Sequence, residues 1–243
     1  RLLDKAIFRS ESQIRAMIVQ LLQRTLADAL AAPNEFGEDW QAVLKSEEKD
    51  PRLRLVPVIR DTDSPAKSGP LVARLFRRLG EVSDDWMVWP WLMQGEIDKG
   101  NKIVLIDDFI GSGQQFINFA NRFLLHQVCL GQLIYSPLVA HEQGLITIRE
   151  TLPNIRVVPG EVLTANYSTL QESSEPFDSH NSQSSARQFY KTYWNRKNIQ
   201  ISKSLLFGWE ELSLVFAFNH GSPNATLPLF WMNRGHHKRI FTR

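Results

Sequence analysis

The stretch Lys102–Gln115 constrains the fold of this chain more than any other part of its sequence. An apolar run rich in β-branched residues, Ile103–Ile106, ends in two carboxylates, Asp107 and Asp108. The turn Gly111–Gly113 follows, and then a pattern typical of a helix. Loops of this kind direct several backbone N–H groups at one point, and the helix N-terminus adds a partial positive charge. The order therefore predicts a strand, an acidic edge, a phosphate-sized loop and a helix.

Acids at this position have several uses. Two carboxylates just before such a loop can hold sugar hydroxyls, or Mg²⁺ through water, while the loop holds a phosphate. A strand ending in two acids also occurs in P-loop ATPases, but the chain lacks their G-x-x-x-x-G-K-[ST] loop. Receiver domains carry their acidic pair after the first strand, whereas here a long segment precedes it. A structural role as helix caps stays open, although a cap needs fewer acids.

The same residues resemble the phosphoribosyl pyrophosphate (PRPP) loop of type I phosphoribosyltransferases. The resemblance implies that Asp107 and Asp108 are catalytic, lie beside the ribose 2′- and 3′-hydroxyls and hold Mg²⁺. It also implies a cradle for the 5′-phosphate, made of Gly111, Ser112, Gly113, Gln114 and Gln115. The family's turn usually ends Thr-Gly-Gly-Thr, whereas this one reads Ser-Gly-Gln-Gln.

A second strand–loop–helix unit precedes this motif. Leu53–Ile59 reads as a buried strand, although its proline is unusual for a central one. Ser68 is a plausible N-cap for a helix over Pro70–Leu79. In the resembled family the corresponding loop binds pyrophosphate, which here implies Lys67, Ser68 and Gly69, with Lys67 stabilising the leaving group. Both loops follow strands, so we expect them at one edge of a parallel sheet.

Strands and helices alternate along the chain, with further strands expected at 132–140 and 154–158 and further helices at 115–127 and 141–151. The pattern predicts an α/β fold, a parallel sheet of the type I phosphoribosyltransferase kind with helices on both faces. We divide the chain into a helical N-terminal extension (1–50), an α/β core (51–163) and a C-terminal insertion with a hood-like segment (164–243).

The segments outside this core give weaker predictions of secondary structure. Residues 5–31 and 40–47 have helical periodicity, and 165–185 reads as a polar surface insertion before a helix at 186–200 and a strand at 212–218.

Aromatic and thiol side chains are expected in the core. Three tryptophans crowd Trp86–Met93, either as core or as a platform for a base or a partner. Gln94–Asn101 occupies the place of a mobile catalytic loop in the resembled family. The single cysteine, Cys129, has apolar neighbours and is predicted to be buried; alone it excludes an internal disulfide.

A late segment, Asn219–Trp231, reads Asn-His-Gly-Ser-Pro-Asn-Ala-Thr-Leu-Pro-Leu-Phe-Trp. Together with the acidic loop it resembles phosphoribosyltransferase-like proteins of bacterial conflict and anti-phage systems. This implies that Asn219, His220, Asn224 and Thr226 lie near the active edge; the alternative is a proline-rich surface turn. The resemblance also implies a protein partner from a defence operon, either an ATPase or a retron reverse transcriptase with its DNA.

Composition adds limits. The formal charge of +2 gives no general attraction to nucleic acid or membrane, although the basic C-terminus, Arg234–Arg243, is a possible nucleic-acid contact. No run approaches the ~18 apolar residues of a membrane span, and no signal-peptide core is visible at the N-terminus. We expect a cytoplasmic protein with no membrane contact.

Three functions stay in view. The first is a phosphoribosyltransferase-like effector that binds PRPP or a nucleotide with Mg²⁺ in anti-phage defence; if it is an enzyme, it transfers or cleaves at ribose C1′. The second is a non-catalytic nucleotide sensor, suggested by Gln114 and Gln115 in place of glycine and threonine. The third is a partner-binding subunit that uses the helical front end and the basic tail.

Overall fold

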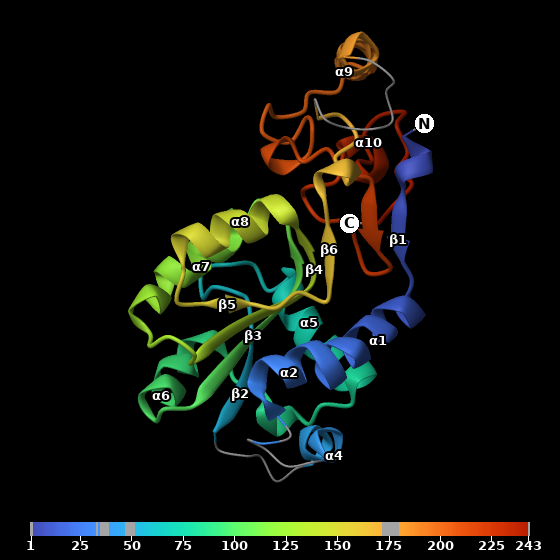
Figure 1. The fold of residues 1–243 in the computed structure, drawn as a ribbon. Helices are drawn as coiled ribbons and strands as arrows, with labels where there is room; N and C mark the ends of the chain where they lie inside the picture. The colour runs from blue at the N-terminus through green and yellow to red at the C-terminus, as the bar shows by residue number, and fades with distance from the viewer. Residues whose placement is uncertain (1, 33, 35–38, 47–51, 172–179, 243) are drawn as a thin grey trace. The chain divides into compact units, whose positions relative to one another are not determined.

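The structure is a computed structural model that describes residues 2–32, 34, 39–46, 52–171 and 180–242. The chain packs into two units (Figure 1). The sheet unit comprises Gln13–Ala140 and Gly144–Val162. The terminal unit comprises Arg1–Ser12, His141–Gln143 and Leu163–Arg243. The domain boundaries at residues 50 and 163 stay a prediction.

A largely parallel sheet forms the centre of the sheet unit. Within the described residues it has five strands: β2 (Leu53–Pro57), β3 (Lys102–Ile110), β4 (Leu133–His141), β5 (Arg156–Val157) and β6 (Glu161–Leu163). Their order is β2-β3-β4-β5, with β6 paired to β4. The pairs β2–β3, β3–β4 and β4–β5 are all parallel. The predicted α/β fold with a parallel sheet is confirmed.

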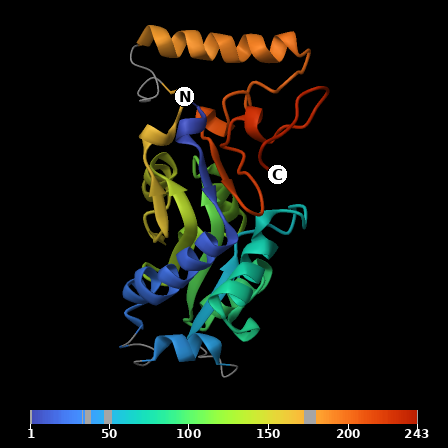
Figure 2. The ribbon, with the colours of Figure 1, turned by 90° about the vertical axis from the view of Figure 1, so that its right-hand side faces the viewer.

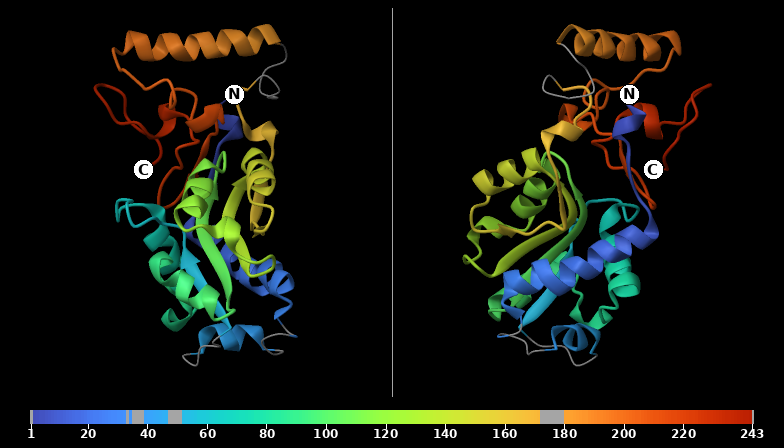
Figure 3. Two further views of the ribbon diagram at one scale, coloured as in Figure 1. Left: turned by 90° about the vertical axis from the view of Figure 1, so that its left-hand side faces the viewer. Right: turned by 45° about the vertical axis from the view of Figure 1, so that its right-hand side comes forward.

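Helices cover both faces of this sheet. They are α1 (Glu11–Gln20), α2 (Leu26–Leu30), α4 (Trp40–Lys45), α5 (Ser68–Gly80), α6 (Met93–Asp98), α7 (Gln114–Arg122) and α8 (Glu142–Thr151). On one face, α7 buries Phe116 and Phe119 in a cluster with Ile103 and Leu105 of β3. Figure 3 shows α7 and α8 on this face and α1 and α2 on the other. The alternation of strand side chains supplies an apolar surface to each helical layer.

The proline in β2 is explained by the topology. β2 is at the end of the strand order, and Pro57 is its last residue. A proline cannot donate a ladder hydrogen bond, so it is tolerated at a strand end on a sheet edge. The next residue restores the pairing, because the Val58 N–H donates to the Ile106 carbonyl at 3.0 Å.

The start of the chain differs from the prediction. Residues 5–31 were expected to be helical, but Ile7–Arg9 forms strand β1, paired in parallel with β7 (Phe216–Phe218). The partner strand lies far away in the sequence, so the periodicity of residues 5–31 gives no sign of this pairing. The helix predicted around residue 40 is confirmed as α4.

The terminal unit has its own core. Besides β1 and β7 it contains α9 (His180–Arg196) and α10 (Pro228–Trp231), and Figure 2 shows α9 as one long helix. Tyr190 and Trp194 of α9 pack with Phe207, Leu227 and Phe230 in one buried cluster. Part of the predicted insertion at 165–185 lies outside the described residues.

The expected burial is found for Trp86 but not for Trp89, Trp91 or Cys129. Trp86 is buried, but Trp89 and Trp91 are 45% and 50% exposed and stack on each other with ring centroids 4.9 Å apart. Cys129 is exposed, and its neighbour Leu130 is 81% exposed. Trp91 lies in the short 3-10 helix Pro90–Leu92, and Cys129 lies in the connection before β4. In each segment a neighbouring valine, Val88 or Val128, packs against the core instead.

Candidate functional site

The acidic pair stands near the end of β3. Strand geometry sends successive side chains to opposite faces. Asp107 therefore shares the face of Leu105, under α7, and its carboxyl still interacts with the side chain of Asp108, the next residue of the strand. Asp107 is 2% exposed, and Asp108 is partly exposed.

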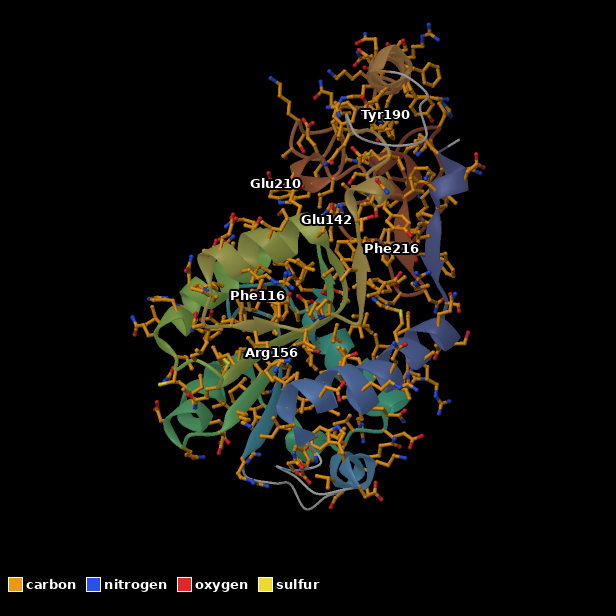
Figure 4. All side chains as sticks on the ribbon, in the orientation of Figure 1. Phe116, Glu142, Arg156, Tyr190, Glu210 and Phe216 are labelled. Carbon is orange, nitrogen blue, oxygen red and sulfur yellow. The ribbon has the colours of Figure 1, made fainter. Side chains whose placement is uncertain are left out.

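Two hydrogen bonds hold the Asp107 carboxyl beneath α7. Its Oδ2 accepts from the Tyr135 hydroxyl at 2.9 Å, and its Oδ1 accepts from the Asp108 backbone N–H at 2.9 Å. The Tyr135 ring stacks on Phe116 of α7, with centroids 3.6 Å apart. Figure 4 shows Phe116 between α7 and the sheet.

Burial sets the electrostatics of this pair. It raises the pKa of Asp107 well above its ordinary value, and the nearby charge of Asp108 raises it further. Burial also raises the pKa of Tyr135, with Asp107 as the next cause. A carboxyl in such surroundings favours its neutral form. The two aspartates thus differ in their surroundings, since Asp107 is buried and Asp108 is partly exposed.

The loop after β3 leads directly into α7. Gly113 has φ +86°, a left-handed conformation that glycine adopts without strain, and α7 starts at the next residue. The Gln114 N–H lies 3.5 Å from the Ser112 hydroxyl, and the Gln114 side chain donates to Asn118 further along the helix. Gly111 and Ser112 are partly exposed, and Gln114 and Gln115 are exposed. The predicted order of strand, acids, loop and helix is thus present.

Gly144 was missed by sequence reasoning. It lies in the first turn of α8, and a Cβ on it would be 2.2 Å from the Gly111 carbonyl oxygen and 3.0 Å from the Gly113 nitrogen. Gly113 is also crowded, though less so, because a Cβ there would be 3.0 Å from the Gly144 carbonyl oxygen. A glycine opening the helix after the next strand was the available signal, but only the fold shows what it touches.

The second predicted loop lies between β2 and α5. Gly69 packs on the end of β2, since a Cβ there would be 2.9 Å from the Val58 carbonyl oxygen. Ser68 is the first residue of α5, so the N-cap is Lys67 and not Ser68 as predicted. Because β2 and β3 are parallel neighbours, the two loops follow the same edge of the sheet, as expected.

The Asp63 carboxylate forms ion pairs with two cations of this loop, Arg60 and Lys67. Asp63 accepts from the Arg60 guanidinium at 2.7 and 3.1 Å, and its Oδ1 lies 3.7 Å from the Lys67 ammonium. The hydrogen bond from Arg60 is the main cause that lowers the pKa of Asp63 to about 2. The predicted phosphate ligand Lys67 therefore already has an anion beside it.

An ion pair joins the same loop to α7. The Arg122 Nε donates to the Asp61 Oδ1 at 2.9 Å, and a second guanidinium nitrogen donates to Oδ2. This bond from Arg122 lowers the pKa of Asp61. The loop after β2 is thereby connected to the helix that follows the β3 loop.

The two late site residues belong to the terminal unit. Asn224 is exposed, and its carbonyl accepts from the Trp209 N–H at 2.9 Å. Thr226 is fully buried, and its hydroxyl donates to the Phe216 carbonyl at 2.6 Å. In the same unit the basic tail is anchored through His237, whose Nδ1 lies 2.7 Å from the Tyr193 hydroxyl.

A comparison of the chain with protein-family models identifies its family. The family model described as PRTase-CE matches residues 1–243. The chain belongs to the PRTase-CE family. It is thus phosphoribosyltransferase-like, as the resemblance implied. A comparison of this PRTase-CE chain with curated proteins found no match.

The residues present fit Mg²⁺ in only one way. In the described part of this PRTase-CE chain, no group of three or more His, Cys, Asp or Glu side chains could hold a metal. Mg²⁺ is often bound by one or two carboxylates together with a ligand's phosphates. Asp108 fits that use because it is partly exposed, whereas Asp107 is buried and both of its oxygens accept hydrogen bonds.

The helices carry one further observation. No helix in the described part of the chain is both long enough and apolar enough to cross a membrane.

Proposed function

We propose that this PRTase-CE protein is an effector that binds a ribose-5-phosphate ligand, either PRPP or a nucleotide. One observation supports it above all: the acidic pair of β3 leads into a glycine loop that opens α7. Carboxylates suit the ribose hydroxyls, and the loop amides with the helix N-terminus suit a phosphate. The acid pair and the loop adjoin in sequence, as a ribose and its 5′-phosphate adjoin in a ligand.

The chemistry, if the protein is an enzyme, lies at ribose C1′. The bond from C1′ to pyrophosphate or a base breaks and its electrons leave with that group, while a nucleophile's lone pair forms the new bond. Asp107 and Asp108 orient the ring, and Lys67, Ser68 and Gly69 stabilise the departing phosphates. Asp108 would hold a Mg²⁺ ion together with those phosphates, and the ion would offset their charge.

A role in anti-phage defence belongs to the same proposal. Its support is the resemblance of the acidic loop and of Asn219–Trp231 to proteins of bacterial conflict systems. A partner from the same operon, an ATPase or a retron reverse transcriptase with its DNA, fits this role. The exposed side chains of Arg234, Lys238 and Arg239 are available for a nucleic-acid contact.

Calorimetric titration tests the binding step. The purified chain is titrated with PRPP, ATP and NAD⁺, each with Mg²⁺, beside the double variant Asp107→Asn, Asp108→Asn. A matched control, Asp84→Asn with Asp85→Asn, removes two adjacent exposed acids elsewhere on the sheet unit. We expect the site variant to lose binding and the control to keep it. Binding that survives in the site variant would refute the proposal.

A second candidate function is a nucleotide sensor without turnover. It is favoured by Gln114 and Gln115, which replace the glycine and threonine of the usual turn, and by the Gln114 side chain bonding along α7. It predicts saturable binding with no product over hours. If no ligand binds, the partner-binding subunit becomes the better account, and deletion of residues 1–50 or 234–243 would abolish partner binding.

A further inference from the structure

We propose that two exposed tryptophans of the sheet unit, together with the outer side of α6, form a docking surface for an arginine-bearing segment of a protein partner. We call this surface the tryptophan face; it consists of Trp89, Trp91, Leu92, Gln94 and Asp98. Figure 1 shows α6 at the outer edge of the sheet unit. The inference goes beyond the proposed function, because none of these residues belongs to the acidic pair or to the two loops.

The tryptophan face exposes apolar side chains that are neighbours. Trp89 and Trp91 are 45% and 50% exposed, and Leu92 is 58% exposed. The two indole rings are nearly parallel, with an angle of 7° between their planes and centroids 4.9 Å apart. Single exposed apolar side chains are ordinary, but a group of adjacent ones is typical of an interaction site. Tryptophan and arginine are both enriched among the residues that dominate binding energy.

The rings are held on a rigid base. Pro90, between the two tryptophans, is buried, and Met93 after them is 1% exposed. Before them, the Val88 N–H donates to the Leu55 carbonyl of β2 at 2.9 Å. Side chains that are fixed before binding lose little conformational entropy when a partner binds. The exposed rings are therefore a preorganised anchor for a partner.

The outer side of α6 continues the surface from the tryptophans. The 3-10 helix that contains Trp91 runs directly into α6, and residues three or seven positions apart along a helix share a face. Gln94 and Asp98 therefore lie on the side of Trp91, and the Gln94 side chain donates to the Asp98 carboxylate at 2.8 Å. All three residues are exposed. A Cβ added at Gly95 would meet no atom of the described residues within 4 Å, so nothing in that part of the chain covers this side of α6.

The charge of this region is negative. Residues 79–98 include five acids and neither lysine nor arginine. Lys99, which follows Asp98, forms an ion pair with Glu96 at 2.8 Å, so its charge is matched there. Asp98 is exposed and is bonded to the neutral amide of Gln94. The tryptophan face thus combines aromatic rings at one end with a carboxylate at the other.

Two kinds of occupant stack on indole rings, and the charge distinguishes them. A nucleobase would bring its phosphates close to these acids. Arg77 of α5, whose guanidinium could bind a phosphate, is already paired with Asp84 at 3.0 Å. A guanidinium, by contrast, stacks on the face of a tryptophan and also pairs with a carboxylate. The tryptophan face therefore matches an arginine of a protein partner better than a base of a nucleic acid.

The length of the tryptophan face sets the spacing of the cations that it fits. Asp98 follows Trp91 by seven positions. Seven residues of helix span roughly 10 Å, and about three residues of extended chain cover the same distance. A segment with two arginines three positions apart can thus place one guanidinium on the rings and the other beside Asp98.

The test uses the full chain with nitrogen-15-labelled tryptophan and follows each indole N–H signal by NMR during titration. The probe is the capped hexapeptide Gly-Arg-Ala-Ala-Arg-Gly, which has this spacing. It is compared with the same peptide carrying lysine, the same peptide carrying neutral citrulline, and an oligothymidylate. The variants Trp89→Phe, Trp91→Phe and Trp209→Phe assign the three signals. Trp209, which is 39% exposed and belongs to the terminal unit, is the internal control.

We expect the arginine peptide to shift the signals of Trp89 and Trp91 and to leave that of Trp209 unchanged. It should bind severalfold more tightly than the lysine peptide and roughly tenfold more tightly than the citrulline peptide, which offers no cation to the rings or the carboxylate. Trp91→Ala should weaken binding of the arginine peptide roughly three- to thirtyfold, and Asp98→Asn about two- to fivefold. Glu150→Gln, at an exposed acid on α8, controls for net charge and should change nothing.

Three results would overturn the inference. The first is equal binding of the arginine and citrulline peptides. The second is a response of Trp89 and Trp91 to oligothymidylate but not to the arginine peptide, which would make the surface a site for bases. The third is no response of these two signals to any probe. The readout is confined to the tryptophan signals, so the result is separate from that of the ribose-phosphate titration.

Discussion

A Cβ on Gly144 would lie 2.2 Å from the carbonyl oxygen of Gly111, because the first turn of α8 packs directly on the loop after β3. No side chain fits that space without moving the backbone of the loop. The conformation of the phosphate loop is thus set partly by a residue on the next helix.

Gly144→Ala should therefore disturb the loop and the fold together. We expect the free energy of unfolding to fall by roughly 1–3 kcal/mol, as in other overpacked sites, and phosphate affinity to fall as well. Gly95→Ala in α6 is the control, since a Cβ there would meet nothing within 4 Å. Urea denaturation and calorimetry measure both effects. Unchanged values in Gly144→Ala would mean that the contact is not needed.

Asp63→Asn should strengthen anion binding at the loop after β2. Asp63 now neutralises Arg60 and Lys67, the cations that a ligand's pyrophosphate would need. Removal of its charge leaves both cations for the ligand, so we expect the affinity for pyrophosphate to rise severalfold. Asp85→Asn, an exposed acid of the same unit, controls for net charge. A weaker affinity for pyrophosphate in Asp63→Asn would show that Asp63 mainly holds the loop in shape and does not compete with the ligand for the cations.

The features that could be read from the sequence are those encoded over a few neighbouring residues. The run Ile103–Ile106, the two acids and the glycine turn predict their own strand, edge and loop, and the structure has each of them. The parallel sheet followed from the alternation of strands and helices. Parallel pairing then brought the loops after β2 and β3 to one edge without further information.

The features that could not be read depend on residues far apart in the chain. The pairing of Ile7–Arg9 with Phe216–Phe218 spans most of the sequence. The contacts of Gly144 and Tyr135 depend on the fold, which places α8 beside the loop and β4 beside the acids. At Trp89 and Cys129 an apolar local sequence predicted burial, but only the fold decides which residue of such a segment faces the core, and there it is Val88 and Val128 that pack against it.

The exposure of Cys129 is directly testable. An exposed thiol reacts with thiol reagents in the native protein, whereas a core thiol reacts only after unfolding. We expect Cys129 to react at a similar rate in buffer and in denaturant, and Cys129→Ser to remove the signal. Strong protection in the native chain, lifted by denaturant, would show that this segment is covered in solution.

His141 should make the terminal unit less stable in mild acid. Its Nδ1 accepts from the Gln143 N–H at 3.3 Å, so Nε2 carries the proton and donates to the Ser168 hydroxyl at 3.2 Å. Burial lowers the pKa of His141, while the charge of Glu142 opposes this shift.

The fold therefore favours the neutral imidazole. Its contribution to stability is complete above the unfolded pKa of about 6.5 and is lost as the pH falls below it. We expect the free energy of unfolding to be lower at about pH 5 than at about pH 7.5. Replacement by glutamine, His141→Gln, should flatten this dependence, and the exposed His126→Gln should not. Denaturant titrations at both pH values measure the difference, and an equal slope in all three proteins would contradict the assignment.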